Sequence, residues 1–259
     1  MKRGRRWLLR ASLALLVVAL VVAAPFVTAF RGLAPIVDGA ELAPGVRTVK
    51  MSFVSAFVLD AGEGRAVLVD AGADRAGTAL LAALRAAGSA PDAVLAVLLT
   101  HGHGDHLAAA PLFRNAAIVA LEAERRLVEG TVTSRSPMGR WSRAKPTGVR
   151  VTRAVRDGES LRFGSLDVRV FALPGHTVGS AAYLARGVLF VGDAASATED
   201  RHVRGPAWVF SESVDRGAAS LRALGARLRR EGLPVTALAP AHSGPLTGDV
   251  VGALSAIGQ

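Results

Sequence analysis

The sequence predicts an α/β fold in which two β-sheets pack together and are covered by helices. Two observations favour this fold class. A group of short apolar strands accompanied by helices occurs twice along the chain, and no repeat or low-complexity linker divides the two groups. A length of 259 residues is ample for one domain of this kind with a large buried core. This grouping favours two sheets over one doubly wound sheet.

The first group of elements is defined by Val-rich runs that are bounded by Gly. The expected strands are 45–52, 53–60, 65–70, 93–100 and 116–120, and the expected helices are 75–87 and 121–129. Residues 61–64, Ala-Gly-Glu-Gly, predict a hairpin turn. The continuous apolar run at 93–100, AVLAVLLT, is typical of a strand that is buried on both faces.

The second group repeats the strand-rich pattern after residue 148. The expected strands are 149–155, 160–163, 167–173, 181–184, 188–191 and 235–239, and the expected helix is 213–231. Polar residues follow several of these strands directly, which indicates that loops at the strand ends carry the chemistry.

The amino-terminal segment predicts export. Five cations and no acid occupy the first ten residues, and residues 11–30 contain no charged residue. Twenty apolar residues at about 1.5 Å each match a hydrocarbon core of roughly 30 Å. We therefore expect residues 1–30 to be a membrane anchor or a cleaved signal peptide, because apolar residues on every face argue against a buried amphipathic helix. The positive-inside rule then places residues 31–259 outside the cytoplasm, either anchored or released as a periplasmic or secreted protein.

Charge and cysteine content exclude several classes of protein. The net charge is +10, but half of it lies in the first ten residues, so the rest of the chain gives little reason to expect a nucleic-acid partner. The chain has no Cys. Its absence excludes disulfides, iron–sulfur clusters, thiol nucleophiles and Cys-ligated zinc.

Residues 101–106, His-Gly-His-Gly-Asp-His, contain three of the six histidines directly after the predicted strand 93–100. Imidazole and carboxylate groups are the ligands that Zn²⁺ accepts where thiolate is absent. Alternate side chains of an extended segment share a face, so we expect His101 and His103 to approach one metal together. Gly102 and Gly104 leave room for a sharp turn, which would bring Asp105 and His106 toward a second metal.

Four ligands do not saturate two metals, so further ligands are expected at other strand ends. The sequence supplies one after each of three predicted strands: His176, Asp193 and His242. This pattern predicts a shared metal cleft. The sixth histidine, His202, lies in a polar stretch and is interpreted as a loop residue.

The chain resembles the metallo-β-lactamase superfamily in four strings, which occur in the family's order: HGHGDH at 101–106, PGHTVGS at 174–180, GD at 192–193 and PAHSGP at 240–245. The resemblance covers nearly all of residues 31–259 and implies one catalytic domain with an αββα sandwich fold. It further implies a first metal held by His101, His103 and His176, a second held by Asp105, His106 and His242, and Asp193 as a bridge. Asp70, in the string LVDAG, matches an aspartate that orients the ligand loop.

The ligand set is similar to that of glyoxalase II and implies two Zn²⁺ ions per chain, with iron or manganese as alternatives. The absence of Cys excludes the β-lactamases that ligate zinc through Cys, and Asp193 argues against the other true β-lactamases. Glyoxalase II carries a helical extension after its last His, whereas only 17 residues follow His242. Flavodiiron proteins have Glu in place of His103.

By resemblance, the expected function is hydrolysis of a small-molecule ester, lactone, thioester, amide or phosphodiester by a metal-bridging hydroxide. Asp105 is the expected catalytic residue, which orients that hydroxide and passes its proton to the leaving group. Two alternatives stay open: a mononuclear iron oxidoreductase similar to persulfide dioxygenases, and a metal-binding protein without turnover.

The segment 135–156 is strongly basic. It contains seven cations and no acid: Arg135, Arg140, Arg143, Lys145, Arg150, Arg153 and Arg156. The simplest interpretation is a solvated loop. The functional alternative is a substrate loop that favours anionic or amphipathic substrates, with Arg140, Trp141 and Arg143 as its contact residues.

Overall fold

The computed structural model describes the chain except residues 1–11, 13–14, 16, 18–20, 22 and 259. Residues 1–31 and 32–259 form two separate units. In the first unit, residues 23–30 are helical. The predicted anchor or signal peptide at 1–30 falls largely on residues outside the described part. Among the residues that are described, no helix has both the length and the apolar character needed to cross a membrane.

The first sheet is built from seven strands that follow the chain order from one edge to the other. They are β1 (Glu41–Ala43), β2 (Val46–Met51), β3 (Val54–Asp60), β4 (Ala66–Val69), β5 (Val94–Leu98), β6 (Ala117–Leu121) and β7 (Arg153–Val155). Strands β1 to β4 pair antiparallel, and β4 to β7 pair parallel. The change at β4 requires crossover connections, which pass over the outer face of the sheet.

The second sheet has the order β15-β14-β11-β10-β9-β8. Its strands are β8 (Ser160–Phe163), β9 (Leu166–Ala172), β10 (Ala181–Ala185), β11 (Val188–Gly192), β14 (Ala237–Pro240) and β15 (Leu246–Thr247). All pairs are antiparallel except β11 with β14. A small separate ribbon pairs β12 (Ser196–Ala197) with β13 (Val203–Arg204).

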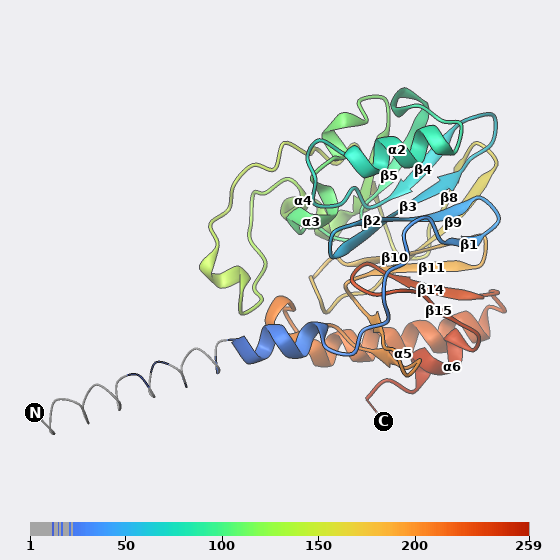
Figure 1. Cartoon of the computed structure of the whole chain (residues 1–259). Helices are drawn as coiled ribbons and strands as arrows, with labels where there is room; N and C mark the ends of the chain where they lie inside the picture. The colour runs from blue at the N-terminus through green and yellow to red at the C-terminus, as the bar shows by residue number, and fades with distance from the viewer. Residues whose placement is uncertain (1–11, 13–14, 16, 18–20, 22, 259) are drawn as a thin grey trace, which may run out of the picture. The chain divides into compact units, whose positions relative to one another are not determined.

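Helices cover the outer faces of both sheets (Figure 1). They are α2 (Thr78–Ala86), α3 (Gly104–Leu107), α4 (Arg125–Val128), α5 (Val214–Arg230) and α6 (Val250–Ser255). The apolar side chains form three layers. One lies beneath α2, one between the sheets, where the Phe57 and Phe190 rings are 4.9 Å apart, and one beneath α5 and α6. This four-layer sandwich confirms the predicted fold class.

Two predicted elements differ from the structure. The strand expected at 149–155 is regular only at β7, because the N–H groups of Val149 and Val151 donate to the side chains of Thr147 and Glu129. The helix expected at 121–129 is shorter, since Leu121 ends β6 and a 3₁₀ turn at Glu122–Glu124 precedes α4. Neither difference moves a strand out of its sheet.

The candidate metal centre

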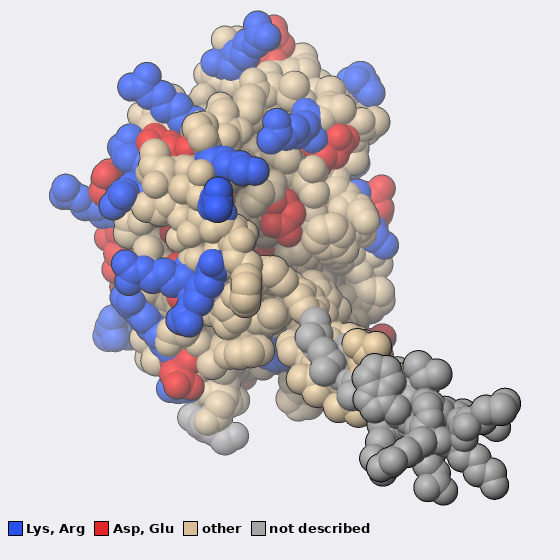
Figure 2. Space-filling model, turned by 90° about the vertical axis from the view of Figure 1, so that its left-hand side faces the viewer, with Lys and Arg blue, Asp and Glu red and all other residues tan. Residues whose placement is uncertain are grey.

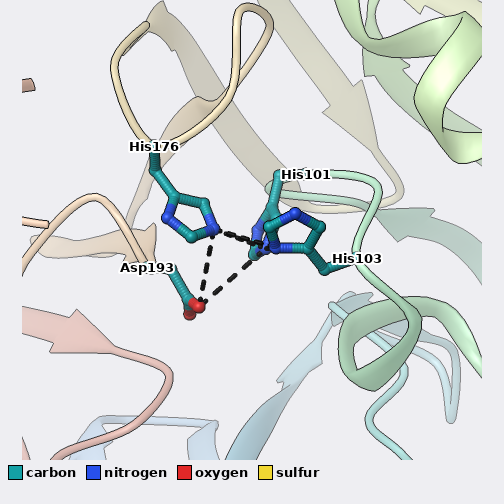
Figure 3. A group of neighbouring side chains, drawn as sticks. All are labelled: His101, His103, His176 and Asp193. Carbon is teal, nitrogen blue, oxygen red and sulfur yellow. Dashed lines mark hydrogen bonds and ion pairs between the residues drawn. The ribbon is translucent and has the colours of Figure 1, made fainter. Parts of the chain in front are cut away.

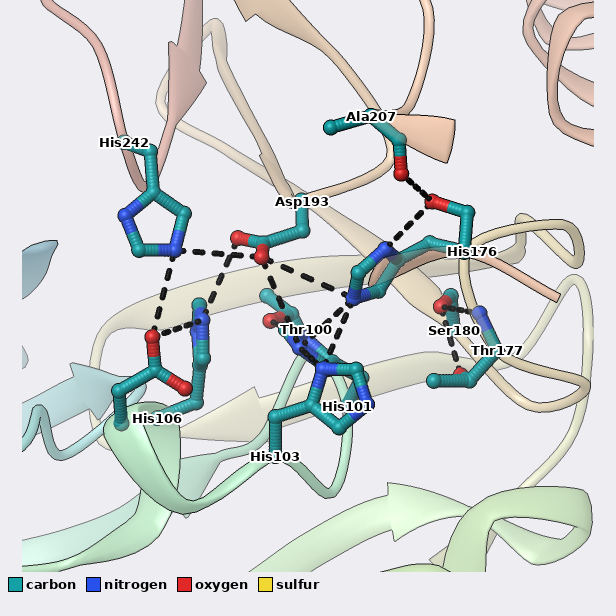
Figure 4. A network of polar contacts seen from close by, with 12 residues as sticks. Thr100, His101, His103, His106, His176, Thr177, Ser180, Asp193, Ala207 and His242 are labelled. Carbon is teal, nitrogen blue, oxygen red and sulfur yellow. Dashed lines mark hydrogen bonds and ion pairs between the residues drawn. The ribbon is translucent and has the colours of Figure 1, made fainter. Parts of the chain in front are cut away.

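Four loops bring the seven ligand-type side chains together at one edge of the sandwich (Figure 4). The loops follow β5, β9, β11 and β14. Each begins where a fully or mostly buried strand ends, so the polar side chains are carried on rigid supports. The structure therefore brings together every residue that the sequence predicts as a ligand.

The first group consists of His101, His103, His176 and Asp193 (Figure 3). His176 Nε2 lies 3.0 Å from His103 Nδ1 and 3.2 Å from His101 Nε2, and His101 Nε2 lies 3.1 Å from His103 Nδ1. Asp193 Oδ2 is 3.6 Å from His176 Nε2. Three ring nitrogens and a carboxylate oxygen thus converge on one point.

The second group consists of Asp105, His106 and His242. His242 Nε2 lies 3.4 Å from Asp105 Oδ2, and His106 Nε2 lies 3.8 Å from the same oxygen. Asp193 reaches this group as well, with Oδ2 3.2 Å from His242 Nε2 and Oδ1 3.2 Å from His106 Nε2. Asp193 therefore lies between the two groups, where a bridging carboxylate is expected.

Hydrogen bonds at the far ring nitrogens orient two of the first-group imidazoles, His101 and His176. Thr100 Oγ1 donates to Asp70 Oδ2 at 2.8 Å, so it accepts from His101 Nδ1 at 3.2 Å. Ser211 Oγ donates to the Ala207 carbonyl at 2.7 Å and accepts from His176 Nδ1 at 3.0 Å. His101 and His176 consequently carry their protons on Nδ1, and the lone pair of each Nε2 faces the centre.

The second-group imidazoles are oriented in the same way. His106 Nδ1 donates to Asp70 Oδ2 at 2.9 Å, and His242 Nδ1 donates to the Phe53 carbonyl at 2.9 Å. Asp70 also accepts the backbone N–H of Thr100 at 2.8 Å. This buried carboxylate thus contacts a ring of the second group directly and a ring of the first group through Thr100, in agreement with the orienting position expected for it.

Glycines allow the ligand loops to approach neighbouring backbone closely. A side chain at Gly102 would collide with the backbone of Leu127 and Val128. Gly175, which precedes His176, lies against Gly217 of α5 and adopts a left-handed φ of 149°. Gly102 therefore provides the space that lets its loop pass close to α4.

Burial keeps the first-group imidazoles neutral. Desolvation, reinforced by the neighbouring His106, holds the pKa of His101 well below its usual value. Desolvation also lowers the pKa of His176 to about 3 and lowers the pKa of His103, although Asp193 opposes both shifts. Neutral imidazole is the form that binds a metal ion.

The second group carries charge. Burial opposes protonation of His242, but Asp193 and Asp105 outweigh it and raise its pKa to about 10. Burial likewise opposes a proton on His106, yet Asp193 and Asp70 raise its pKa well above the usual value. The carboxyl pKa of Asp193 falls well below its usual range, because His242 and His106 outweigh the effect of its burial.

The residues fit a pair of cations in two respects. Four ligands at about 2.0–2.1 Å from a tetrahedral Zn²⁺ lie about 3.3–3.4 Å apart, and the first-group nitrogens are 3.0 to 3.2 Å apart with their lone pairs facing one another. In the second group, His106 Nε2 and Asp193 Oδ1 are buried and form no hydrogen bond of acceptable geometry with any described residue. Both features are typical of ligand atoms that share a positive ion.

The structure places the predicted substrate residues on an exposed segment. Arg140 and Trp141 lie in a 3₁₀ turn at Gly139–Trp141, and the Trp141 side chain is 90% exposed. Lys and Arg side chains are spread over the side of the molecule shown in Figure 2, the side on which this segment lies. Among the described residues, no hydrogen bond or ion pair joins Arg140, Trp141 or Arg143 to the ligand groups.

The base of the basic segment is nevertheless linked to the ligand loop at 174–180. Met138 N–H donates to the Val209 carbonyl, and Arg135 N–H donates to Glu212 Oε1 at 3.0 Å. Glu212 N–H in turn donates to the His176 carbonyl at 3.0 Å. The segment is thus joined to the site through its first residues, whereas its tip faces solvent.

Three contributors to the site were not predicted from the sequence: Ser211, the Phe53 carbonyl and Glu124. Each contacts a ligand or a ligand loop across a long separation along the chain. Phe53 also stacks on His242, with ring centroids 5.6 Å apart. A serine, a backbone carbonyl and a glutamate have no distinctive spacing, so no local pattern could have revealed them.

Comparison with known proteins identifies the family. The chain belongs to the metallo-beta-lactamase superfamily, whose family model matches residues 49–242. The match includes every predicted ligand and confirms the family that the sequence motifs indicate.

Curated relatives include several proteins named hydroxyacylglutathione hydrolase. The one from Xanthomonas axonopodis pv. citri is 35% identical over 137 residues, which cover 53% of this chain and 44% of the relative. The one from Klebsiella pneumoniae is 30% identical over 139 residues, covering 53% and 45%. This chain therefore spans just under half the length of the curated relatives it matches.

Solved structures share the fold over most of the chain. A B3 metallo-beta-lactamase with an active-site glutamic acid has a TM-score of 0.64 at 22% identity, with 90% of this chain and 89% of the other covered. A metallo-beta-lactamase family protein from Thermus thermophilus has a TM-score of 0.59 at 26% identity, with 83% and 78% covered.

Proposed function

We propose that this protein is a hydrolase that uses two divalent metal ions, with zinc as the preferred metal. The observation that carries the proposal is the arrangement of two groups of ligand atoms around one shared carboxylate, Asp193. His101, His103 and His176 would hold the first ion, and Asp105, His106 and His242 the second. Ligand sets that contain only nitrogen and oxygen atoms favour zinc, iron or manganese over metals that require thiolate.

Two ions at this edge would supply Lewis-acid polarisation of the scissile bond and a strong nucleophile at neutral pH. The chain's own residues supply orientation. Thr100, Ser211 and Asp70 hold three of the imidazole rings in one tautomer, so the metal-facing nitrogens need no rearrangement during turnover. Asp193 fixes the relative position of the two groups.

Asp105 is the proposed proton carrier. Its side chain is 28% exposed, whereas the side chain of Asp193 is 13% exposed, so Asp105 is the more accessible of the two carboxylates. Burial opposes the charge on Asp105, but the hydrogen bond from His242 and the charge of His106 keep its pKa low. Oδ2 lies 3.4 Å from His242 Nε2, so the other carboxylate oxygen would be the one to accept a proton and return it to a leaving group.

An acyl compound is the proposed substrate class. The curated relatives are named for hydrolysis of hydroxyacylglutathione, which supports esters and thioesters ahead of phosphodiesters. The basic segment 135–156, which is joined to the ligand loop at 174–180 through its first residues, supports an anionic acyl substrate, because cations raise the local concentration of an anion.

A panel of substrates tests this proposal. The full chain, loaded with zinc, is assayed with an ester, a lactone, a thioester, an amide and a phosphodiester, with and without a chelator. We expect chelator-sensitive turnover of at least one acyl compound and its loss in Asp105→Asn. Turnover that persists after metal removal, or no turnover of any compound by protein with two bound zinc ions, would contradict the proposal.

We also propose export of residues 31–259 across the cytoplasmic membrane. The support is the cationic and apolar pattern of residues 1–30. Fractionation of cells that produce the full chain with a carboxyl-terminal tag tests this. Recovery of the tag in the periplasm or on the outer face of the membrane is the expected result, and recovery in the cytoplasm would contradict it.

A further inference from the structure

Glu124 is a fully buried carboxylate beside the first metal group. It ends the 3₁₀ turn that precedes α4, and it is not one of the ligand-type residues. Burying a carboxylate costs several kcal/mol unless hydrogen bonds compensate for lost hydration. Both of its oxygens do find donors, and those donors lie in two different ligand loops.

One carboxylate oxygen serves each loop. Gly102 N–H donates to Glu124 Oε1 at 2.8 Å, and Gly102 is the residue between His101 and His103. Gly179 N–H donates to Glu124 Oε2 at 2.9 Å, and Gly179 lies three residues after His176. Gly102 and Gly179 are 77 positions apart, so this carboxylate joins two segments that are distant in the sequence.

The glycines at both contact points make the arrangement possible. A side chain at Gly179 would collide with the backbone nitrogen and Oε2 of Glu124. A side chain at Gly102 would collide with Val128, at the end of the helix that follows Glu124. The two ligand loops are therefore packed directly against the turn that carries the carboxylate.

The His176 loop is further ordered around this contact. Thr177 N–H donates to Ser180 Oγ at 3.0 Å, and the two hydroxyl oxygens are 2.7 Å apart. The Thr177 side chain also favours the charged form of Glu124 and so lowers its pKa. Burial raises the pKa of Glu124 to about 7, whereas these hydrogen bonds favour its charged form.

We propose that Glu124 is a positioning residue that sets the distance between the His101–His103 loop and the His176 loop, and thereby the metal affinity of the first group. The second group does not depend on it, because His106 and His242 are oriented by Asp70 and the Phe53 carbonyl. This inference rests on the proposal that the two groups bind metal, but not on the reaction that they catalyse.

Glu124→Gln is the test variant, because it keeps the shape of the side chain. A Gln amide offers one acceptor oxygen, and its NH₂ group would face the N–H of the other loop. We expect the zinc affinity of the first group to fall about 10- to 100-fold, the range seen when a partner that orients ligands is removed. The affinity of the second group should stay within about threefold of the unaltered protein.

Zinc competition with a chromophoric chelator, performed on the full chain, measures both affinities. Glu129→Gln is the matched control, since Glu129 caps the same short helix and accepts a backbone N–H from Val151. Glu129→Gln should retain both affinities. Unchanged affinities in Glu124→Gln, or an equal loss in both groups, would overturn the inference.

Hydrogen exchange on the unaltered, metal-free protein covers the case in which Glu124→Gln does not fold. The Gly102 and Gly179 amides should both exchange slowly, because one buried carboxylate holds them. Exchange of either amide at the rate of an unstructured peptide would contradict the positioning role. Failure of the unaltered protein to bind any metal would instead contradict the proposed function.

Discussion

The two ligand groups lie side by side, yet their imidazoles differ in charge. His101 and His176 are each 1% exposed, and burial keeps their rings neutral. Asp105 and His242 are 28% and 11% exposed, and His242 carries a proton because Asp193 and Asp105 stabilise it.

Because of this difference in charge, the two groups would bind a metal ion in different ways. The first group is held with its lone pairs facing inward by Thr100, Ser211 and Glu124, so a metal ion meets neutral ligands already in place. In the second group, protons on the imidazoles compensate the carboxylates, and a metal ion has to displace those protons. We expect the first group to bind earlier and more tightly.

The largest loss of activity is expected from substitution of Asp193, the residue that the two groups share. Asp193→Asn should lower acyl hydrolysis by about three orders of magnitude or more, because metal-ion stabilisation contributes several kcal/mol. It should also abolish the difference between the groups, since both lose the same ligand. His202→Ala is the control, as His202 is exposed and pairs with Asp200 instead. Activity within tenfold of the unaltered protein in Asp193→Asn would argue against a shared ligand.

Acid should remove metal from the second group first. The pKa of His176 is lowered to about 3 and that of His242 is raised to about 10, with Asp193 and Asp105 outweighing burial in the second case. Protons therefore compete with metal mainly at His242 and His106. Lowering the pH from about 8 to about 5.5 should reduce bound zinc from two ions to one.

Two ligand variants identify which ion leaves. His242→Ala should bind one zinc ion and keep it as the pH falls, whereas His176→Ala should lose its remaining ion over the same range. Metal content after equilibration and desalting at each pH measures this. Release in the opposite order would reverse the comparison between the groups.

Loss of the hydrogen bond that orients the His101 ring should have a smaller effect. Thr100→Val removes the hydroxyl that accepts from His101 Nδ1 and donates to Asp70, while nearly conserving side-chain volume. Zinc affinity of the first group should decrease about tenfold, at the lower end for partners of ligand residues. Chelator competition measures it. A larger loss of zinc affinity in the second group would show that Thr100 matters more for the orientation of Asp70 than for that of His101.

The smallest effect is expected from the basic segment. Replacing both Arg140 and Arg143 by Glu should raise the KM of an anionic acyl substrate severalfold at low salt and leave kcat unchanged, because screened surface charges affect encounter more than chemistry. The KM of a neutral ester serves as the internal control. Equal changes for both substrates would remove the charge-based role of this segment.

The clustering of the candidate ligands was predictable because metal coordination demands particular residue types, and these stand at the ends of buried strands. HGHGDH is dense and contiguous, and His176, Asp193 and His242 each follow an apolar run. The two-sheet sandwich was predictable for a similar reason, since strands buried on both faces leave long Val-rich runs.

The supporting contacts were not predictable. Glu124 lies in the string LEAERR, where a surface position on a helix is the ordinary expectation, and only the fold brings its carboxylate beneath two ligand loops. His242 is oriented by the backbone carbonyl of Phe53, and backbone groups carry no signature in a sequence. The difference between the two ligand groups therefore emerges only from the three-dimensional arrangement.

The central claim is that the two ligand groups bind two metal ions, and the metal content of the protein tests it most directly. The full chain is purified without added metal, equilibrated with zinc at about pH 8, desalted and analysed for metals and protein. We predict close to two zinc ions per chain and close to one in each of His176→Ala and His242→Ala. A single tightly bound iron in the unaltered protein, or no stoichiometric metal at all, would contradict a two-metal hydrolase.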